Sequence, residues 1–310
     1  DGQGKVTAWD FLDRSFPWTE SQGTPQLAER QIGIVSTNDG NPNGAGGGGD
    51  VYGFDSMRIG SKTLPWMFPE AMPLRTASLR SPGEPPRVFA TESFIDEIAA
   101  ELHMDPVQFR LNYIKEDKRM TEALRTVAEK VGWVERPSPA PPATGTVLKG
   151  RGVAINQRGG SIPAAVAEVE VDTTTGKVRV TRVTMAYDCG LIINPDGVRN
   201  QIEGNIMQGV SRTLLEEFRF DATGAKSEDW VSYPVLRFMD VPDVQIYLIN
   251  RPELPAAGAA ETPIVVVPSA IANAIFDATG VRLREIPFTP ERVLSALKAK
   301  GAIVFDYGNN

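Results

Sequence analysis

The sequence has 310 residues, of which 41% are hydrophobic and 23% charged, and these values are typical of a globular protein with a core of its own. A formal net charge of -7 argues against a nucleic-acid-binding surface. A single cysteine, Cys189, excludes an internal disulfide, and together with a single histidine, His103, it excludes the usual Cys/His zinc site. No apolar run approaches the length that we expect of a membrane span.

The N-terminal region is predicted to begin with a strand, since residues 5–16 carry several apolar and aromatic side chains. Residues 38–50 read NDGNPNGAGGGGD, and this density of glycine and asparagine excludes regular structure. We expect a surface loop there, with a loop that crosses onto a partner chain as the alternative. The chain opens without methionine, which predicts the C-terminal part of a longer polypeptide, or a processed or separately encoded subunit.

Three helices are predicted in the region that follows. The first spans residues 88–102, where apolar residues recur at helical spacing. Asp105 is placed as the N-cap of the second helix, with proline at the first helical position and Gln108 in position for a capping box. The third helix spans residues 121–131.

A proline-rich stretch, PSPAPPATGT at residues 137–146, is predicted to be a linker. The composition changes there from helical to strand-like. We therefore place a domain boundary in it, between a first subdomain of residues 1–136 and a second of residues 147–310.

The second subdomain is predicted to begin with a β-hairpin, formed by strands at residues 166–172 and 177–185. A long helix follows at residues 200–218. It contains Gly204 and Gly209, each of which costs about 1 kcal/mol relative to alanine in a helix. We therefore expect another segment or a ligand to approach the helix closely at both positions.

Gln201 and Gln208 lie two turns apart on the same side of this helix as the glycines. Neutral amides both donate and accept hydrogen bonds, which suits an anionic, oxygen-rich ligand. Further along, residues 230–249 predict two strands joined by a proline turn, and residues 289–298 predict the last helix.

Glu261 is the only charged residue between Glu253 and Asp277, in a run crowded with small side chains. Small residues let a backbone approach a ligand closely. Desolvation disfavours the charged form of a carboxyl group, and such an environment is typical of a general acid or base. The alternative is a loop glutamate that faces water or pairs with an arginine. An apolar helix follows the loop, with Gly280 as its C-terminal stop.

Three stretches of the chain resemble the molybdenum hydroxylases, the family of xanthine dehydrogenases, aldehyde oxidoreductases and isoquinoline-oxidoreductase-type large subunits. The family's Gly-x-Gly-Glu-Pro loop corresponds to residues 258–261, with Ala260 in place of the second glycine and Thr262 before the proline. The turn at Arg80 and the helices after it also resemble the family. A third motif matches at Asp188, Gly190, Asn194, Pro195, Gln201, Glu203, Gly204, Gln208 and Gly209.

The resemblance implies roles for single residues. Glu261 falls on the catalytic base of the family, and Arg80 falls on an arginine near the substrate. Gln201 and Gln208 fall on glutamines that approach the cofactor and the oxygen ligands of its metal. No protein side chain is expected to hold the metal, because the dithiolene sulfurs of the cofactor do so in the family. The other positions expected to contact the cofactor are Gly204, Gly209, Gly258, Ala259 and Ala260.

The resemblance also implies a fold and a reaction. The expected fold is α+β, with two molybdopterin-binding-type subdomains of mixed sheets and packed helices, as the C-terminal part of a larger subunit. The expected reaction is hydroxylation of an aldehyde, or of a carbon beside a ring nitrogen, with water as the oxygen donor. The expected cofactor is molybdenum with molybdopterin cytosine dinucleotide. Electrons would leave through iron–sulfur clusters on a partner chain, and another chain or segment would supply the N-terminal half of the molybdenum subunit.

Two other interpretations remain open. The chain could be a non-catalytic binding or assembly module that keeps the fold. Ala260 supports this, whereas the presence of Gln201, Gln208 and Glu261 opposes it. A flavin- or nicotinamide-dependent dehydrogenase is opposed by the lack of a G-x-G-x-x-G motif at a predicted strand–helix junction.

Overall fold

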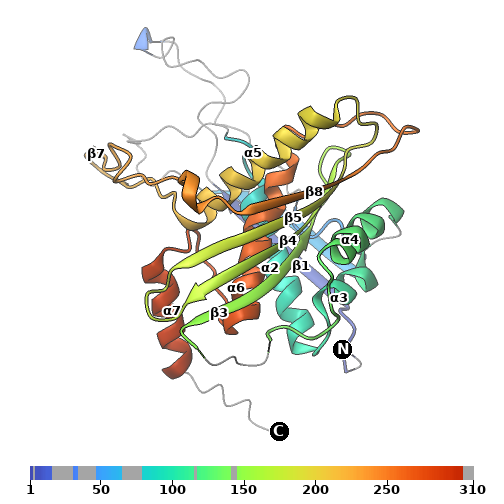
Figure 1. The fold of residues 1–310 in the computed structure, drawn as a ribbon, viewed down its shortest axis with the longest axis horizontal. Coiled ribbons are helices and arrows are strands. Elements are labelled where there is room, and N and C mark those ends of the chain that lie inside the picture. Colours follow the sequence, from blue (N-terminus) through green and yellow to red (C-terminus); the bar gives the residue numbers. More distant parts are fainter. Residues whose placement is uncertain are drawn as a thin grey trace.

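The structure is a computed structural model, and it describes residues 1–2, 4–15, 31–33, 47–64, 79–114, 117–140 and 145–302. Its centre is a four-stranded sheet with the strand order β3-β4-β5-β8 (Figure 1). The strands β3 (Val147–Ile155), β4 (Ile162–Asp172) and β5 (Val178–Asp188) form an antiparallel meander. β8 (Asp243–Ile249) pairs with β5 in parallel, so the sheet is mixed.

Helices pack on both faces of this sheet, which confirms the predicted α+β class of mixed sheet and packed helices. α6 lies against β3 and β4, whereas α4 lies against β4 and β5 (Figure 1). The α-helices of the described residues are α2 (Glu84–Glu101), α3 (Pro106–Tyr113), α4 (Lys118–Lys130), α5 (Pro195–Leu214), α6 (Val267–Thr279) and α7 (Pro290–Ala302). Two short 3-10 helices are η1 (Phe238–Asp240) and η2 (Thr262–Val266).

Two small sheets complete the described elements. β1 (Ala8–Ser15) pairs in parallel with β2 (Ser56–Thr63), and β6 (Phe220–Asp221) pairs with β7 (Gly224–Ala225) in a hairpin. The predicted strand at residues 5–16 is thus confirmed, because β1 lies within it.

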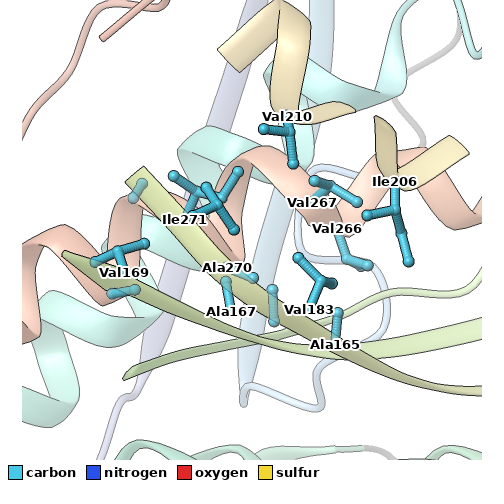
Figure 2. Close-up of a cluster of buried hydrophobic side chains, with 14 of the residues drawn as sticks. Ala165, Ala167, Val169, Val183, Ile206, Val210, Val266, Val267, Ala270 and Ile271 are labelled. Atoms are coloured by element: carbon cyan, nitrogen blue, oxygen red, sulfur yellow. The ribbon is translucent and has the colours of Figure 1, made fainter. Parts of the chain in front are cut away.

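The alternation of side chains along β4 divides the core into two clusters. Ala165, Ala167 and Val169 face α5 and α6 in the first cluster. Figure 2 shows Ile206 of α5 and Val267 of α6 in the same cluster. Ile162, Ala164 and Val166 of the same strand face the second cluster, together with buried residues of α2, α3 and α4. One strand therefore connects the part of the fold that carries α5 and α6 with the part that carries the earlier helices.

α6 lies unusually close to the sheet, because β3 presents glycine to it. A Cβ atom at Gly152 would lie 2.1 Å from the backbone nitrogen of Ala274, and one at Gly150 would lie 2.2 Å from the carbonyl oxygen of Ala274.

Within the described residues, the run Thr262–Thr279 reaches a mean hydropathy of 1.3 over 18 residues, with 83% of it buried. By length and composition this run could cross a membrane, so the prediction that no run could is wrong. In the structure the run forms η2 and α6, which lie in the core.

The predicted helices are confirmed, with changes at their ends. α2 begins at Glu84 rather than near residue 88, because prolines are tolerated in its first turn. α5 begins at Pro195 with Asn194 as its N-cap, and α7 continues to Ala302. The capping box at α3 is wrong: Asp105 accepts from the backbone of Val107 and Gln108, but the amide of Gln108 donates to Asn112.

Two predicted elements differ more. The hairpin at residues 166–185 is confirmed, but the first strand expected after residue 230 is wrong. That segment forms turns and η1, and its apolar side chains are exposed, with Phe238 at 97% and Val231 at 87%. Residues 38–46 lie outside the described residues. The end of the glycine run is not a surface loop, because Gly47, Gly48 and Gly49 are buried and the indole of Trp9 donates to Gly48 O at 2.7 Å.

The domain boundary at residues 137–146 stays a prediction. The structure describes residues 137–140 and 145–146 of this stretch.

Candidate functional site

Two segments that are far apart in the sequence meet at α5, the loop before α2 and the loop that carries Glu261. Arg80, in the loop before α2, donates from Nη2 to Gln201 Oε1 at 2.5 Å and from Nη1 to Gln208 Oε1 at 3.3 Å. Its Nε donates to the carbonyl oxygen of Ala260 at 2.6 Å. One guanidinium group therefore connects both glutamines of α5 with the loop that carries Glu261.

The two glutamines keep their donors available. Each accepts from Arg80 through its oxygen, and neither amide nitrogen has a hydrogen-bond partner among the described residues. Gln201 and Gln208 are both exposed on α5. A cation flanked by two free N–H₂ groups is suited to an anionic ligand with several oxygen acceptors.

Glu261 lies next to this group and is held at both carboxylate oxygens. Oε2 accepts from the backbone N–H of Ser81 at 2.9 Å, and Oε1 forms an ion pair with Nη1 of Arg158. The side chain is 39% exposed. The expected isolation of Glu261 in apolar surroundings is therefore wrong, and the alternative of pairing with an arginine is the one that the structure has.

Buried polar side chains hold the loop of residues 255–261 by donating hydrogen bonds to its carbonyl oxygens. Asn205 of α5 donates from Nδ2 to Ala259 O at 3.2 Å and to Ala260 O at 3.3 Å. Tyr187 and Ser161 both donate to the carbonyl oxygen of Gly258, at 2.7 and 2.8 Å. The burial of Tyr187 raises the pKa of its phenol, so it remains a donor at neutral pH.

A cavity of about 310 Å³ opens beside the N-terminus of α5. Gln201 and the loop residues Gly258 and Ala259 line it, together with apolar residues such as Leu191 and Ile193. The helix begins there with Asn194, which caps it by accepting from Gly197 N at 2.9 Å. A long helix presents free backbone N–H groups and a partial positive charge at this end.

The two glycines of α5 differ in what surrounds them. A Cβ atom at Gly209 would lie 2.7 Å from Cγ1 of Val267, so the expected close approach is confirmed, and the approaching segment is α6. At Gly204 the nearest atom is Nη1 of Arg80 at 3.5 Å, an ordinary contact. A role of either glycine in cofactor binding stays a prediction.

Burial and two nearby charges of opposite sign affect the guanidinium of Arg80. Burial lowers the pKa of its guanidinium, nearby Arg212 lowers it further, and Glu261 opposes both. An arginine remains charged despite such a shift.

Cys189, on the cavity wall, is a buried free thiol, and burial raises its pKa. It therefore remains a thiol, which is a poorer metal ligand than a thiolate.

The structure thus brings Arg80, Gln201, Gln208, Ala260 and Glu261 together, and it sets Gly258 and Ala259 on the adjoining cavity wall. Sequence reasoning missed Ser81, Arg158 and Asn205. Only Asn205 had a signal, since a polar residue on the apolar side of a helix requires a partner.

Sequence profiles of the molybdopterin cofactor-binding domain match residues 95–242 and residues 73–114. The chain is 38% identical to a nicotinate dehydrogenase subunit from Pseudomonas putida, over 97% of this chain and 25% of that protein. It is 34% identical to the beta subunit of isoquinoline 1-oxidoreductase from Brevundimonas diminuta, over 69% of this chain and 26% of that protein. The chain thus spans about a quarter of the length of these relatives.

Solved structures show the same fold. Quinoline 2-oxidoreductase from Pseudomonas putida 86 superposes with a TM-score of 0.70 at 14% identity, covering 96% of this chain and 61% of that chain. Aldehyde oxidoreductase from Desulfovibrio gigas gives a TM-score of 0.65 at 18% identity, covering 80% of this chain and 44% of that chain.

Proposed function

Because the chain belongs to the molybdenum hydroxylases, within their molybdopterin cofactor-binding domains, we propose that it forms the catalytic part of an oxidoreductase site. The reaction is hydroxylation of an aldehyde, or of an aromatic carbon beside a ring nitrogen, with water as the oxygen donor. The observation that carries this proposal is the meeting of Glu261 with Arg80, Gln201 and Gln208 in one place.

The donors of the site fit the cofactor of this family. Gln201 and Gln208 would hold its oxygen-rich part through their free amide N–H₂ groups, and the cavity at the start of α5 would take an adjoining part of it. We propose the cytosine dinucleotide form, as the resemblance implies. When bound, the cofactor supplies the metal that activates water and accepts the electrons of the reaction.

Glu261 would act as the general base. A carboxylate accepts a proton well only if it is placed within hydrogen-bond distance of the group that loses it. The N–H of Ser81 and the guanidinium of Arg158 fix this carboxylate, and its 39% exposure leaves it accessible. Arg80 would orient an electron-rich atom of the substrate, because two of its five N–H donors are not used by Gln201, Gln208 and Ala260.

Further chains or segments complete the enzyme in this proposal. One supplies the N-terminal half of the molybdenum subunit, which the quarter-length match to the relatives supports. Another carries the iron–sulfur clusters that receive electrons, because such clusters need several cysteines and this sequence has one.

The test is Glu261→Gln in the assembled complex, analysed for molybdenum and iron and assayed with an aldehyde and an N-heterocycle. We expect the metal content to be unchanged and turnover to fall by about 10²- to 10⁴-fold, the usual contribution of a general base. Glu203→Gln, on the neighbouring helix, is the matched control and should retain turnover.

Two results would count against the proposal. Normal turnover in Glu261→Gln would remove the assigned base. An intact complex without molybdenum would instead favour the non-catalytic module. Ala260, in place of the family's glycine, gives the non-catalytic module little support. Ala260 is exposed and contacts the site through its carbonyl oxygen rather than its methyl group.

A further inference from the structure

Arg158, in the turn between β3 and β4, connects two carboxylates at the edge of the site. Its Nη1 pairs with Oε1 of Glu261, and its Nε lies 3.0 Å from Oε2 of Glu84, the first residue of α2. Both partners are partly shielded, since the side chain of Arg158 is 26% exposed and that of Glu84 is 17% exposed. No sequence motif marks this arginine.

Ser81 closes a ring with the same groups. Nη1 of Arg158 also donates to Ser81 Oγ at 2.8 Å, and Ser81 Oγ donates to the carbonyl oxygen of Glu261 at 2.8 Å. Ser81 has a φ of 56°, in the left-handed region that is unfavourable for a residue other than glycine. Such conformations persist where surrounding contacts enforce them, and they concentrate at functional sites.

We propose that Arg158 is a positioning residue, which fixes the carboxylate of Glu261 in one orientation and is itself fixed by Glu84. This inference rests on the proposed role of Glu261 as the base. Without Arg158, one hydrogen bond from the backbone of Ser81 would hold the carboxylate, and the group would rotate about its terminal torsions. Misplacement of a reacting group by about 1 Å can lower a rate by about 10²-fold.

The geometry favours positioning over substrate binding. Nη1 of Arg158 donates to Ser81 Oγ and pairs with Glu261, and Nε lies within ion-pair distance of Glu84, so both nitrogens contact groups of the chain itself. Arg80, by contrast, donates to the amide oxygens of Gln201 and Gln208, whose nitrogens have no hydrogen-bond partner among the described residues. We therefore expect Arg158 to affect the rate of the chemical step and not the affinity for substrate.

The experiment compares Arg158→Ala and Arg158→Lys with the parent in the assembled, metal-loaded complex. We expect kcat to fall by about 10²-fold in the alanine variant with KM unchanged, as for an interaction that matters only in the transition state. Lysine keeps the charge but not the planar fork, so its loss should be intermediate. Millimolar guanidinium should restore part of the activity of the alanine variant.

A crystal structure of Arg158→Ala gives a readout that does not depend on activity. We expect the contact between Glu261 Oε2 and the backbone nitrogen of Ser81, 2.9 Å in the parent, to be lost or to occur in several conformers. Arg182→Ala is the matched control, because Arg182 also joins two carboxylates, Glu168 and Asp243, away from the site. Its kcat should equal that of the parent.

The outcomes separate the two proposals. If Glu261→Gln abolishes turnover but Arg158→Ala keeps the parental kcat, the positioning role is wrong and the proposed function stands. If Glu261→Gln keeps turnover, the proposed function itself fails. A rise in KM at constant kcat in Arg158→Ala would assign Arg158 to substrate binding, and an undisturbed Glu261 in the crystal would equally overturn the inference.

Discussion

Asp188, Gly190 and Asn194, which belong to the motif that precedes and begins α5, each have a structural role. Asp188 ends β5 and accepts from the backbone N–H of Gly190 at 3.0 Å. Gly190 has a φ of 72°, and a Cβ there would lie 2.0 Å from the carbonyl oxygen of Pro255. Any other residue would displace the segment that leads to Glu261. Asn194 then caps α5, so these positions fix the entry of the helix and the loop beside it.

The pH dependence of stability tests the task of Asp188. Its side chain is fully buried and pairs with Arg119 at 2.6 Å and Arg251 at 3.0 Å. Burial by itself raises the pKa of this carboxyl, but hydrogen bonds from Arg119, Gly190 and Arg251 outweigh burial and lower the pKa below its ordinary 3.8. The stabilisation is therefore present above about pH 4 and is lost as the pH falls through the folded-state pKa.

We expect Asp188→Asn to lower the free energy of unfolding at pH 7 by about 3–5 kcal/mol, because it leaves two arginines without their buried partner. Its stability should also fall less steeply than that of the parent below pH 4. Denaturant titrations at several pH values measure both effects. Asp243→Asn, at an exposed ion pair, should change stability by at most about 1 kcal/mol. An acid limb as steep as that of the parent in Asp188→Asn would contradict this account.

At the scale of elements, the packing of α5 against α6 explains one of the two helix glycines. Gly209 faces Val267, the fully buried first residue of α6, whereas Gly204 faces the movable end of Arg80. The first contact involves side-chain atoms close to the backbone of a core helix, which cannot yield easily. The second involves the tip of a long side chain.

Alanine substitutions at the two glycines should therefore have opposite effects on stability. Gly209→Ala should lower the free energy of unfolding by about 1–3 kcal/mol, because overpacking exceeds the gain in helix propensity. Gly204→Ala should leave it unchanged or raise it by up to about 1 kcal/mol. Chemical denaturation of both variants compares them directly. Equal effects would show that α6 can move away from α5 without loss of packing.

At the scale of the whole molecule, a buried charge network connects the helices with the segment after α6. Arg110 of α3 is fully buried and pairs with Glu92 at 2.9 Å and Asp96 at 3.2 Å, both on α2. Arg282 pairs with Asp96 at 3.1 Å and donates to Asn273 of α6 at 2.7 Å. The network also reaches β3, since Ile155 N donates to Glu92 at 3.1 Å.

Removal of one charged residue of this network should lower the stability of the whole fold. We expect Arg110→Met to lower the free energy of unfolding by about 3–5 kcal/mol, because it leaves the buried carboxylate of Glu92 without an arginine and leaves Asp96 with Arg282 alone. Arg284→Met, at a pair with Glu97 in which the arginine is 70% exposed, should cost about 0–1 kcal/mol. Equal unfolding midpoints for these two variants would show that the network adds nothing to stability.

The sequence by itself determined the elements and most of the candidate site residues. Periodic apolar residues and capping signals are local, so they predicted α3, the hairpin of β4 and β5, and α6 within a few residues. Motif resemblance added Arg80 and the role of Glu261 as the base. The turn segment near Phe238 was mistaken for a strand, because its apolar residues do not face a core.

Only the tertiary structure decided how those residues meet and what holds them. Ser81 and Glu261 are 180 positions apart in the sequence, and no local pattern encodes their hydrogen bond. Arg158 reaches Glu261 because the sheet brings the turn between β3 and β4 beside the loop before α6. Glu261 therefore lies in an ion pair and not in the apolar isolation that its neighbours in the sequence predict. The physical reason is that charges pair through space, whereas sequence patterns report only on neighbours along the chain.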